Sequence, residues 1–185
     1  EIRFFPDSWE IQKGCLVAVD VIIDTSEQAI AATDVVIETS LEYIDFVPNK
    51  TLLPNFFPPK VSDYSIHIIG FVSNPKATVK GSGSIGTLFL KQKNSTDADG
   101  NLKLYFAWLG KTYDSNLSVL WGIDILEKAW EGMYRFVDTA TCEYPADSTI
   151  VGGFAHMSAE KALSKTINAL KRKERLSRRN IIPWI

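Results

Sequence analysis

Oxygen-bearing side chains alternate in the short stretch NSTDADGN. Ser95, Asp97 and Asp99 occupy every second position, Gly100 follows directly, and Asn101 comes next. Calcium takes oxygen ligands from alternating positions of a loop that a glycine allows to bend sharply. The pattern therefore predicts a calcium site formed by Ser95, Asp97, Asp99 and Asn101.

The same stretch is also typical of a plain hairpin turn. An Asp-Gly pair favours a tight turn between two strands without any ligand. The bidentate glutamate that ends a complete calcium loop is missing, because Phe106 stands at that place. A carboxylate from another loop, Asp114 or Asp124, could replace it. Calcium binding and a plain turn are therefore two open interpretations.

Catalytic chemistry has little support in the sequence. The two histidines, His67 and His156, lie in no motif that pairs a base with a nucleophile. The sequence carries no phosphate-binding loop, no nucleophile elbow and no HExxH zinc motif. We therefore predict a protein that is not an enzyme.

The two cysteines, Cys15 and Cys142, lie far apart and match no metal-binding spacing. Two interpretations are open from the residues alone. Both side chains could be buried free thiols, or they could form one disulfide, which persists in an oxidising compartment.

The 20 basic and 22 acidic residues give a net charge of −2, but the two signs are unevenly distributed. Acidic residues are in excess over residues 1–156, and basic residues dominate 157–185. We predict a basic helix at 158–178, with Ser158 as its N-cap. We favour docking of this helix on the acidic body over a solvated helix or polyanion binding. An acidic body repels nucleic acid, and no aromatic residues interleave the basic ones.

Apolar and polar residues alternate with a period of two over most of the remaining sequence, which is typical of strands. In LVAVDVIID (16–24) both sides are largely apolar, which indicates a strand inside a sandwich. Turn signals separate the segments, and we interpret the Gly/Ser-rich stretch 80–86 as a linker. No apolar stretch is long enough to cross a membrane. The pattern predicts an all-β sandwich or barrel followed by a helical tail.

In their order and spacing, these segments resemble the cohesin-type jelly-roll domain, especially the cohesin-like domains of prokaryotic surface and extracellular proteins. The match covers about residues 2–138. Three blocks carry it: VAVDVIIDT with AIAATDVVIETSLEYIDFV, then SIHIIGFVSNP with GSGSIGTLFLKQK, and finally TYDSNLSVLWGIDILEKAWEGMYRFV.

The resemblance implies an all-β jelly-roll sandwich of about nine strands, in which the first and last strands are neighbours. We expect this sandwich to span residues 1–144 and the extension with the basic helix to span 145–185. On such a fold Cys15 and Cys142 both flank terminal strands, so the resemblance favours a disulfide between them.

We predict a secreted or cell-surface protein that acts by protein–protein contact. The sequence begins with Glu1 rather than Met, which fits a removed leader or a fragment. Both ends suit the exchange of segments between subunits, so we predict a self-assembling filament subunit. The residues expected to form the assembly contacts are Ile2, Phe4, Phe5, Lys171, Arg172, Lys173, Arg175, Ile182 and Trp184.

Two alternatives to self-assembly remain open. The first is a cohesin module that binds a dockerin-like partner, as the resemblance implies. The second is a carbohydrate-binding module whose aromatic face would be formed by Trp9, Trp108, Trp121 and Trp130. We expect instead that most of these tryptophans pack in the core, because large aromatic side chains dominate core packing.

Overall fold

The structure, a computed structural model, describes residues 1–74, 77–94, 98–104 and 114–138. Within these ranges it contains twelve strands, several of them very short, and no helix, which confirms the all-β prediction. Consequently, no helix of this part of the chain is long and apolar enough to cross a membrane. The helix predicted at 158–178 lies outside the described residues.

The first of two sheets, sheet A, has four antiparallel strands. Its order is β1 (Ile2–Phe5), β3 (Leu16–Asp24), β9 (Ser82–Lys91) and β5 (Glu42–Pro48). The long central strands β3 and β9 pair along their whole length.

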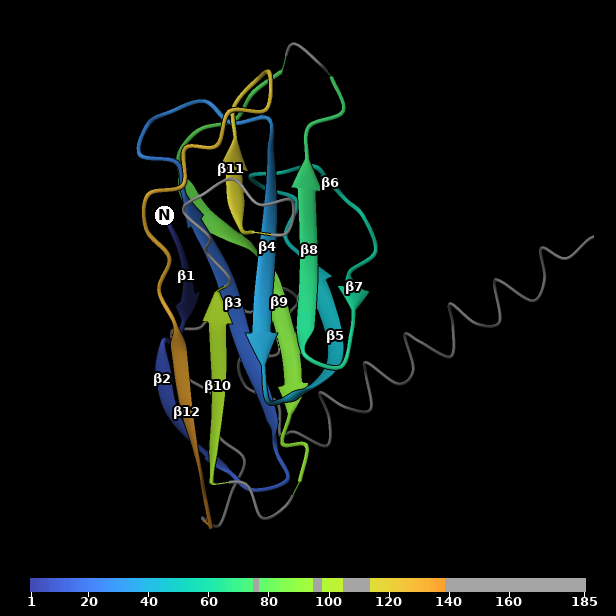
Figure 1. Cartoon of the computed structure of the whole chain (residues 1–185), viewed down its shortest axis with the longest axis vertical. Helices are drawn as coiled ribbons and strands as arrows, with labels where there is room; N and C mark the ends of the chain where they lie inside the picture. Colours follow the sequence, from blue (N-terminus) through green and yellow to red (C-terminus); the bar gives the residue numbers. More distant parts are fainter. Residues whose placement is uncertain (75–76, 95–97, 105–113, 139–185) are drawn as a thin grey trace, which may run out of the picture.

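Sheet B packs against sheet A and has a mixed edge (Figure 1). Its order is β2 (Ser8–Gln12), β12 (Gly132–Val137), β10 (Asp99–Leu104), β4 (Ala32–Thr39), β8 (Ser65–Phe71) and β6 (Asn55–Phe56). Two further short strands extend it: β11 (Asn116–Ser118) pairs with β4, and β7 (Lys60–Val61) pairs with β8. Strands β2 and β12 are parallel neighbours, so the expected contact between the ends of the sandwich is confirmed.

The N-terminal segment belongs to both sheets. Strand β1 pairs with β3 in sheet A, and after Pro6 and Asp7 the chain continues as β2 in sheet B. The hydroxyl of Tyr134, a residue that is 2% exposed, donates a hydrogen bond of 2.8 Å to the carbonyl oxygen of Pro6. This hydrogen bond fixes the position at which the chain passes from sheet A to sheet B. The N-terminal segment therefore contributes one strand to each sheet.

The core lies between the sheets and is formed by alternate residues of each strand. From β3 it takes Val17, Val19, Val21 and Ile23, none of which is more than 1% exposed. Strands β4, β8, β9 and β12 contribute in the same way. Because the same alternation places every other residue on the opposite face, each sheet also has an outer face.

The Gly/Ser-rich stretch 80–86 is not a linker, because β9 begins at Ser82. Gly86 has a φ of +156°, and a Cβ there would lie against the ring of Phe46 and 2.6 Å from the carbonyl oxygen of Val47. The glycine therefore serves a close approach of β5 to β9 rather than flexibility. Glycine content alone does not distinguish these two uses.

Candidate functional site

The outer face of sheet B carries several exposed polar and charged side chains. On β4, β8 and β10 the residues that alternate with core residues point away from sheet A. Glu38, Asn101 and Lys103 are exposed, whereas Asp34 and His67 are partly exposed. We use the name "face B" for this surface, which comprises Asp34, Val36, Glu38, Ser65, His67, Ile69, Phe71, Asn101 and Lys103.

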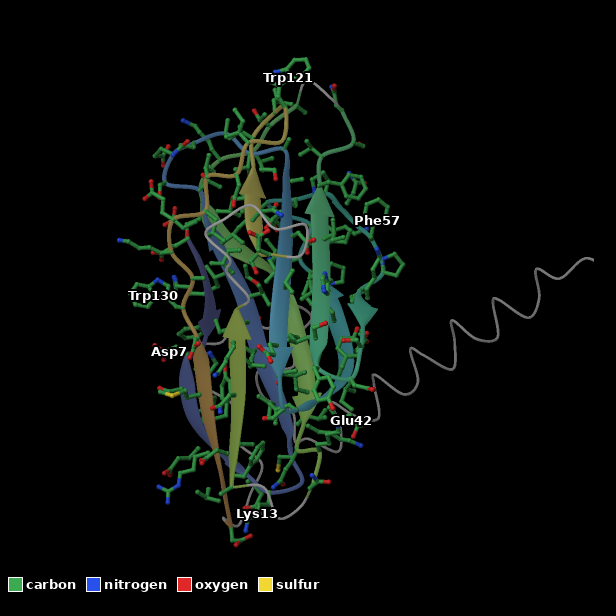
Figure 2. All side chains as sticks on the ribbon, viewed as in Figure 1. Asp7, Lys13, Glu42, Phe57, Trp121 and Trp130 are labelled. Atoms are coloured by element: carbon green, nitrogen blue, oxygen red, sulfur yellow. The ribbon has the colours of Figure 1, made fainter. Side chains whose placement is uncertain are left out.

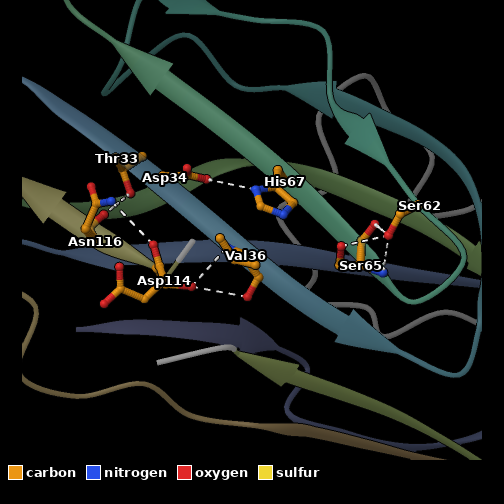
Figure 3. A network of polar contacts seen from close by, with 9 residues as sticks. Thr33, Asp34, Val36, Ser62, Ser65, His67, Asp114 and Asn116 are labelled. Carbon is orange, nitrogen blue, oxygen red and sulfur yellow. Dashed lines mark hydrogen bonds and ion pairs between the residues drawn. The ribbon is translucent and has the colours of Figure 1, made fainter. Parts of the chain in front are cut away.

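At the centre of face B, an aspartate on β4 lies beside a histidine on β8 (Figure 3). Asp34 Oδ1 is 4.0 Å from His67 Nδ1, and both side chains are about one-fifth exposed (23% and 21%). Asp34 Oδ1 has no hydrogen-bond partner among the described residues. Burial raises the pKa of Asp34; His67 and then Lys60 lower it, and Asp114 raises it. The Asp34 carboxylate is therefore partly shielded from solvent, and the nearby His67 and Lys60 favour its ionised form.

The side chain of Ser115 forms hydrogen bonds with the backbone of β4 where no neighbouring strand does so. Strand β10 pairs with the end of β4, and β11 pairs with its beginning, so Val36 lies between the two. The Ser115 hydroxyl accepts a hydrogen bond from the Val36 N–H (2.9 Å) and donates one to the Val36 carbonyl oxygen (3.2 Å). Ser115 is fully buried. The side chain therefore satisfies backbone groups that the interrupted strand pairing would leave unpaired.

One end of face B opens into a groove of about 490 Å³. Its walls carry charges of both signs, with Glu38 and Asp63 opposite in sign to Lys93 and Lys103. Tyr64 lines the groove with 72% of its surface exposed. The ammonium group of Lys93 lies 6.0 Å from the centroid of the Tyr64 ring, within cation–π range. Tyrosine is enriched at protein-binding surfaces, and the rim of such a surface is polar.

Apolar side chains lie along the side of face B formed by β6, β7 and β8. Phe57 stacks on Phe71, with ring centroids 4.7 Å apart and an interplanar angle of 25°. Phe57 is 53% exposed and Val61 is 48% exposed. Figure 2 shows Phe57 projecting from this side of the sandwich. Face B therefore combines an apolar margin with a charged groove.

The predicted calcium ligands lie partly outside the described residues. Asp99 and Asn101 are in strand β10, where they pair with Arg135 and Met133, while Ser95 and Asp97 lie outside. Asp124 Oδ1 accepts hydrogen bonds from the N–H groups of Leu117 in β11 (3.0 Å) and of Leu126 (2.9 Å). The described residues contain no group of three His, Cys, Asp or Glu placed to hold a metal ion. Calcium binding stays a prediction.

The tryptophans are more exposed than we expected. Trp121 is 97% exposed and Trp130 is 53% exposed, whereas Trp9 packs partly against the core; Trp108 lies outside the described residues. Trp121 is at the tip of a turn with a φ of +79°, followed by Gly122 at +77°. Figure 2 places Trp121 at one tip of the molecule and Trp130 along its side, so these two do not form one aromatic face.

The predicted assembly residues at the N-terminus lie in the core of their own chain. Ile2 and Phe4 are 0% and 1% exposed and belong to β1, which pairs with β3. These side chains are therefore not available to a neighbouring subunit while the sandwich is intact, and Phe5 is partly buried in the same strand. The other assembly residues, 171–184, lie outside the described residues, as do His156 and Cys142.

Replacing Asp34 by asparagine is expected to stabilise the fold near neutral pH by about 1 kcal/mol and to have little effect in acid. The folded-state pKa of Asp34 is raised above the reference value of 3.8, so the folded state binds the proton more tightly than the unfolded state. The stability that this provides is fully present below pH 3.8 and is lost as the pH rises through the folded-state pKa.

Urea unfolding of Asp34→Asn and the parent protein from pH 3 to pH 8 measures this difference. The same change at the exposed Asp63 is the matched control for the loss of one carboxylate charge. A gain for Asp34→Asn that is equal at all pH values, or a loss at neutral pH, would contradict the argument.

Comparison with known proteins gives agreement in fold but not in sequence. No protein-family model matches the chain, and no curated protein matches it significantly. CaCohA2 of Clostridium acetobutylicum, solved in complex with CaDoc0917, aligns with a TM-score of 0.60 at 15% identity over 74% of this chain and 98% of that one.

Two other cohesins give similar values. A non-cellulosomal cohesin of Archaeoglobus fulgidus has a TM-score of 0.53 and 17% identity over 74% of this chain and 89% of its own. The third ScaC cohesin of Acetivibrio cellulolyticus, in complex with the ScaB dockerin, has a TM-score of 0.56 and 12% identity over 71% of this chain and 94% of its own. The chain therefore has the jelly-roll fold of cohesin modules.

Proposed function

We propose that this protein is a non-catalytic binding module of the cohesin type, which binds a dockerin-like helical partner on face B. The observation that carries the proposal is the contrast between the two sheets. Face B leaves charged and aromatic side chains open, whereas Ala18, Asp20, Thr87 and Phe89 at the centre of the outer face of sheet A are buried. Two of the structurally similar cohesins were solved in complex with a partner module, one of them a dockerin with a C-terminal helix.

The composition of face B suits a partner helix with both apolar and charged side chains. The stacked pair of Phe57 and Phe71 offers an apolar contact, and the groove beside Tyr64 offers charges of both signs. Exposed tyrosines surrounded by polar residues are frequent centres of binding energy in protein interfaces. A rigid sheet also presents these side chains without a large entropy loss on binding.

A secreted or cell-surface location belongs to this proposal. The structurally similar proteins include a cohesin from a cell-surface anchoring scaffoldin. Self-assembly through the chain ends is the less favoured reading, because Ile2 and Phe4 are already packed inside the sandwich.

Replacing Tyr64 by alanine is expected to weaken partner binding at least about ten-fold. The change removes an exposed ring from the groove while the buried core stays unaltered. Isothermal titration calorimetry against a panel of purified dockerin modules, including the ScaB dockerin of Acetivibrio cellulolyticus, measures the affinity.

Trp130→Ala is the matched control, because Trp130 is a similarly exposed aromatic residue away from face B. Its affinity should equal that of the parent. Equal losses in both variants would place the contact elsewhere, and a panel without any binding dockerin would contradict the proposed partner class.

A further inference from the structure

The hairpin that follows β11 carries a tryptophan at its tip. Trp121 is 97% exposed, and Ile123 on the same tip is 64% exposed. Figure 2 shows Trp121 at one end of the elongated molecule, so this side chain projects from the sandwich and does not line a pocket. Aromatic side chains contribute to stability through the large area that they bury. At this position the indole makes no such contribution.

The hairpin is held in shape by its own hydrogen bonds. The Val119 N–H donates to the Ile123 carbonyl oxygen (2.9 Å), and the Gly122 N–H donates to the Val119 carbonyl oxygen (3.1 Å). At the base, Asp124 Oδ1 accepts two backbone N–H groups at 3.0 and 2.9 Å. The tip is therefore preformed, and it presents Trp121 to a ligand without a large ordering cost.

The backbone conformation of Trp121 makes a bulky residue unfavourable at this point. The hydrogen bond between Gly122 and Val119 makes Trp121 the third residue of a turn, and its φ is +79°. Glycine or asparagine is usual at such a position, because a Cβ is strained at positive φ. Strain of this kind is concentrated at functional sites. Strain without burial indicates that the indole serves a ligand and not the fold.

The tip is a continuous run of uncharged residues, VLWGI at 119–123. Val119 and Leu120 are partly exposed, and the other three residues are exposed. Single exposed apolar side chains are ordinary on a protein surface, whereas a contiguous exposed run marks a binding site. The apolar character is therefore a property of the whole turn.

These features fit the interface between a lipid bilayer and water. Tryptophan is enriched at this interface, because its ring is apolar and its N–H is polar. A sugar stacked on the indole would also need polar side chains for its hydroxyl groups, and 119–123 has none. A stable protein interface takes about 800 Å² from each partner, which is more than so small a projecting tip provides.

The charged residues near the tip indicate which lipids suit it. In the loops beside β11, Glu27 pairs with Lys80 at 3.4 Å. Further along the chain Glu127 precedes Lys128, and Asp124 adds another negative charge. Attachment to anionic lipid depends on clustered lysine and arginine, which the described residues do not provide here. A bilayer of zwitterionic lipid is therefore the surface that fits this end of the molecule.

We propose that the tip 119–123 inserts Trp121 and Ile123 into the headgroup region of a zwitterionic lipid bilayer. The contact is weak and reversible, because the inserted apolar area is small. Strand β11 places the tip beside the start of β4, whereas the groove at Tyr64 lies at the end of β4. The inference is thus independent of the proposed function, and both contacts can form at once.

Co-sedimentation of the full-length chain with phosphatidylcholine vesicles at millimolar lipid measures this contact. We expect Trp121→Gly to lower the partition coefficient at least about ten-fold, because the indole supplies most of the inserted area. Glycine suits the φ of +79°, so this variant should unfold at the same or a higher urea concentration than the parent. Trp130→Gly, at a 53% exposed tryptophan away from the tip, is the matched control and should bind vesicles like the parent.

The possible results separate insertion from the alternatives. Absence of vesicle binding by the parent, or equal binding by the parent and Trp121→Gly, would overturn the proposal. Binding that disappears at high salt would show adsorption by charge and would also overturn it. Loss of dockerin affinity in Trp121→Gly would assign the tip to a protein partner instead. Salt-resistant vesicle binding that Trp121→Gly loses, with dockerin affinity unchanged, supports the proposal.

Discussion

Replacing Cys142 by serine is expected to lower the free energy of unfolding by about 4–5 kcal/mol. A bridge between Cys15 and Cys142 would close a loop that contains most of the chain, and so long a loop strongly restricts the unfolded state. Cys15 is 3% exposed at the turn between β2 and β3, beside the end of β12. Cys142 follows the end of β12 by a few residues, which is within reach of that turn.

Alkylation before and after reduction, followed by mass measurement, counts the free thiols and tests the bridge directly. Urea unfolding gives the stability, and the reduced parent protein is the control, since it should match the Cys142→Ser variant. Alkylation of both cysteines without reductant would show that the bridge is absent. In that case the variant should unfold at the same urea concentration as the parent.

Replacing Gly86 by alanine should lower the free energy of unfolding by about 3 kcal/mol. The new Cβ would lie 2.6 Å from the carbonyl oxygen of Val47 and against the ring of Phe46, and backbone cannot yield to it as a flexible side chain can. The φ of +156° adds backbone strain for any residue with a Cβ. We expect β5 to separate from β9 locally, with lower hydrogen-exchange protection in both strands.

Gly83→Ala is the matched control in the same strand. Nothing lies within 4 Å of a Cβ at this position, so the change should be neutral or slightly stabilising, because alanine restricts the unfolded chain. Chemical denaturation of both variants gives the comparison. Similar stabilities for the two variants would show that the contact between β5 and β9 can relax, and would contradict the argument.

The strand pattern could be predicted from the sequence because a strand repeats every two residues. The alternation of apolar and polar residues over most of the chain predicted the all-β fold, and the order of the segments led to the cohesin-type jelly roll. The pairing of the first and last strands followed from that resemblance and is confirmed by β2 and β12. The period of two was enough to predict the strands, because a strand that buries one face must have an apolar residue at every second position.

The candidate binding surface could not be predicted in the same way, because it depends on contacts between distant residues. Asp34 and His67 become neighbours only through the register of β4 and β8. No local signal reveals the role of Ser115. Its hydroxyl bonds to the Val36 backbone because Val36 lies between the parts of β4 that pair with β10 and with β11.

The outcome for the N-terminus and for the two faces was likewise decided by tertiary structure. The alternation of EIRFF is the same whether its partner strand belongs to this chain or to a neighbour, and the structure assigns it to β3 of this chain. In 16–24 both sides are largely apolar, so the sequence could not distinguish the side that faces the core from the side that faces away from it. A period of two gives a strand two faces, but only the layers packed on each face decide which one meets solvent.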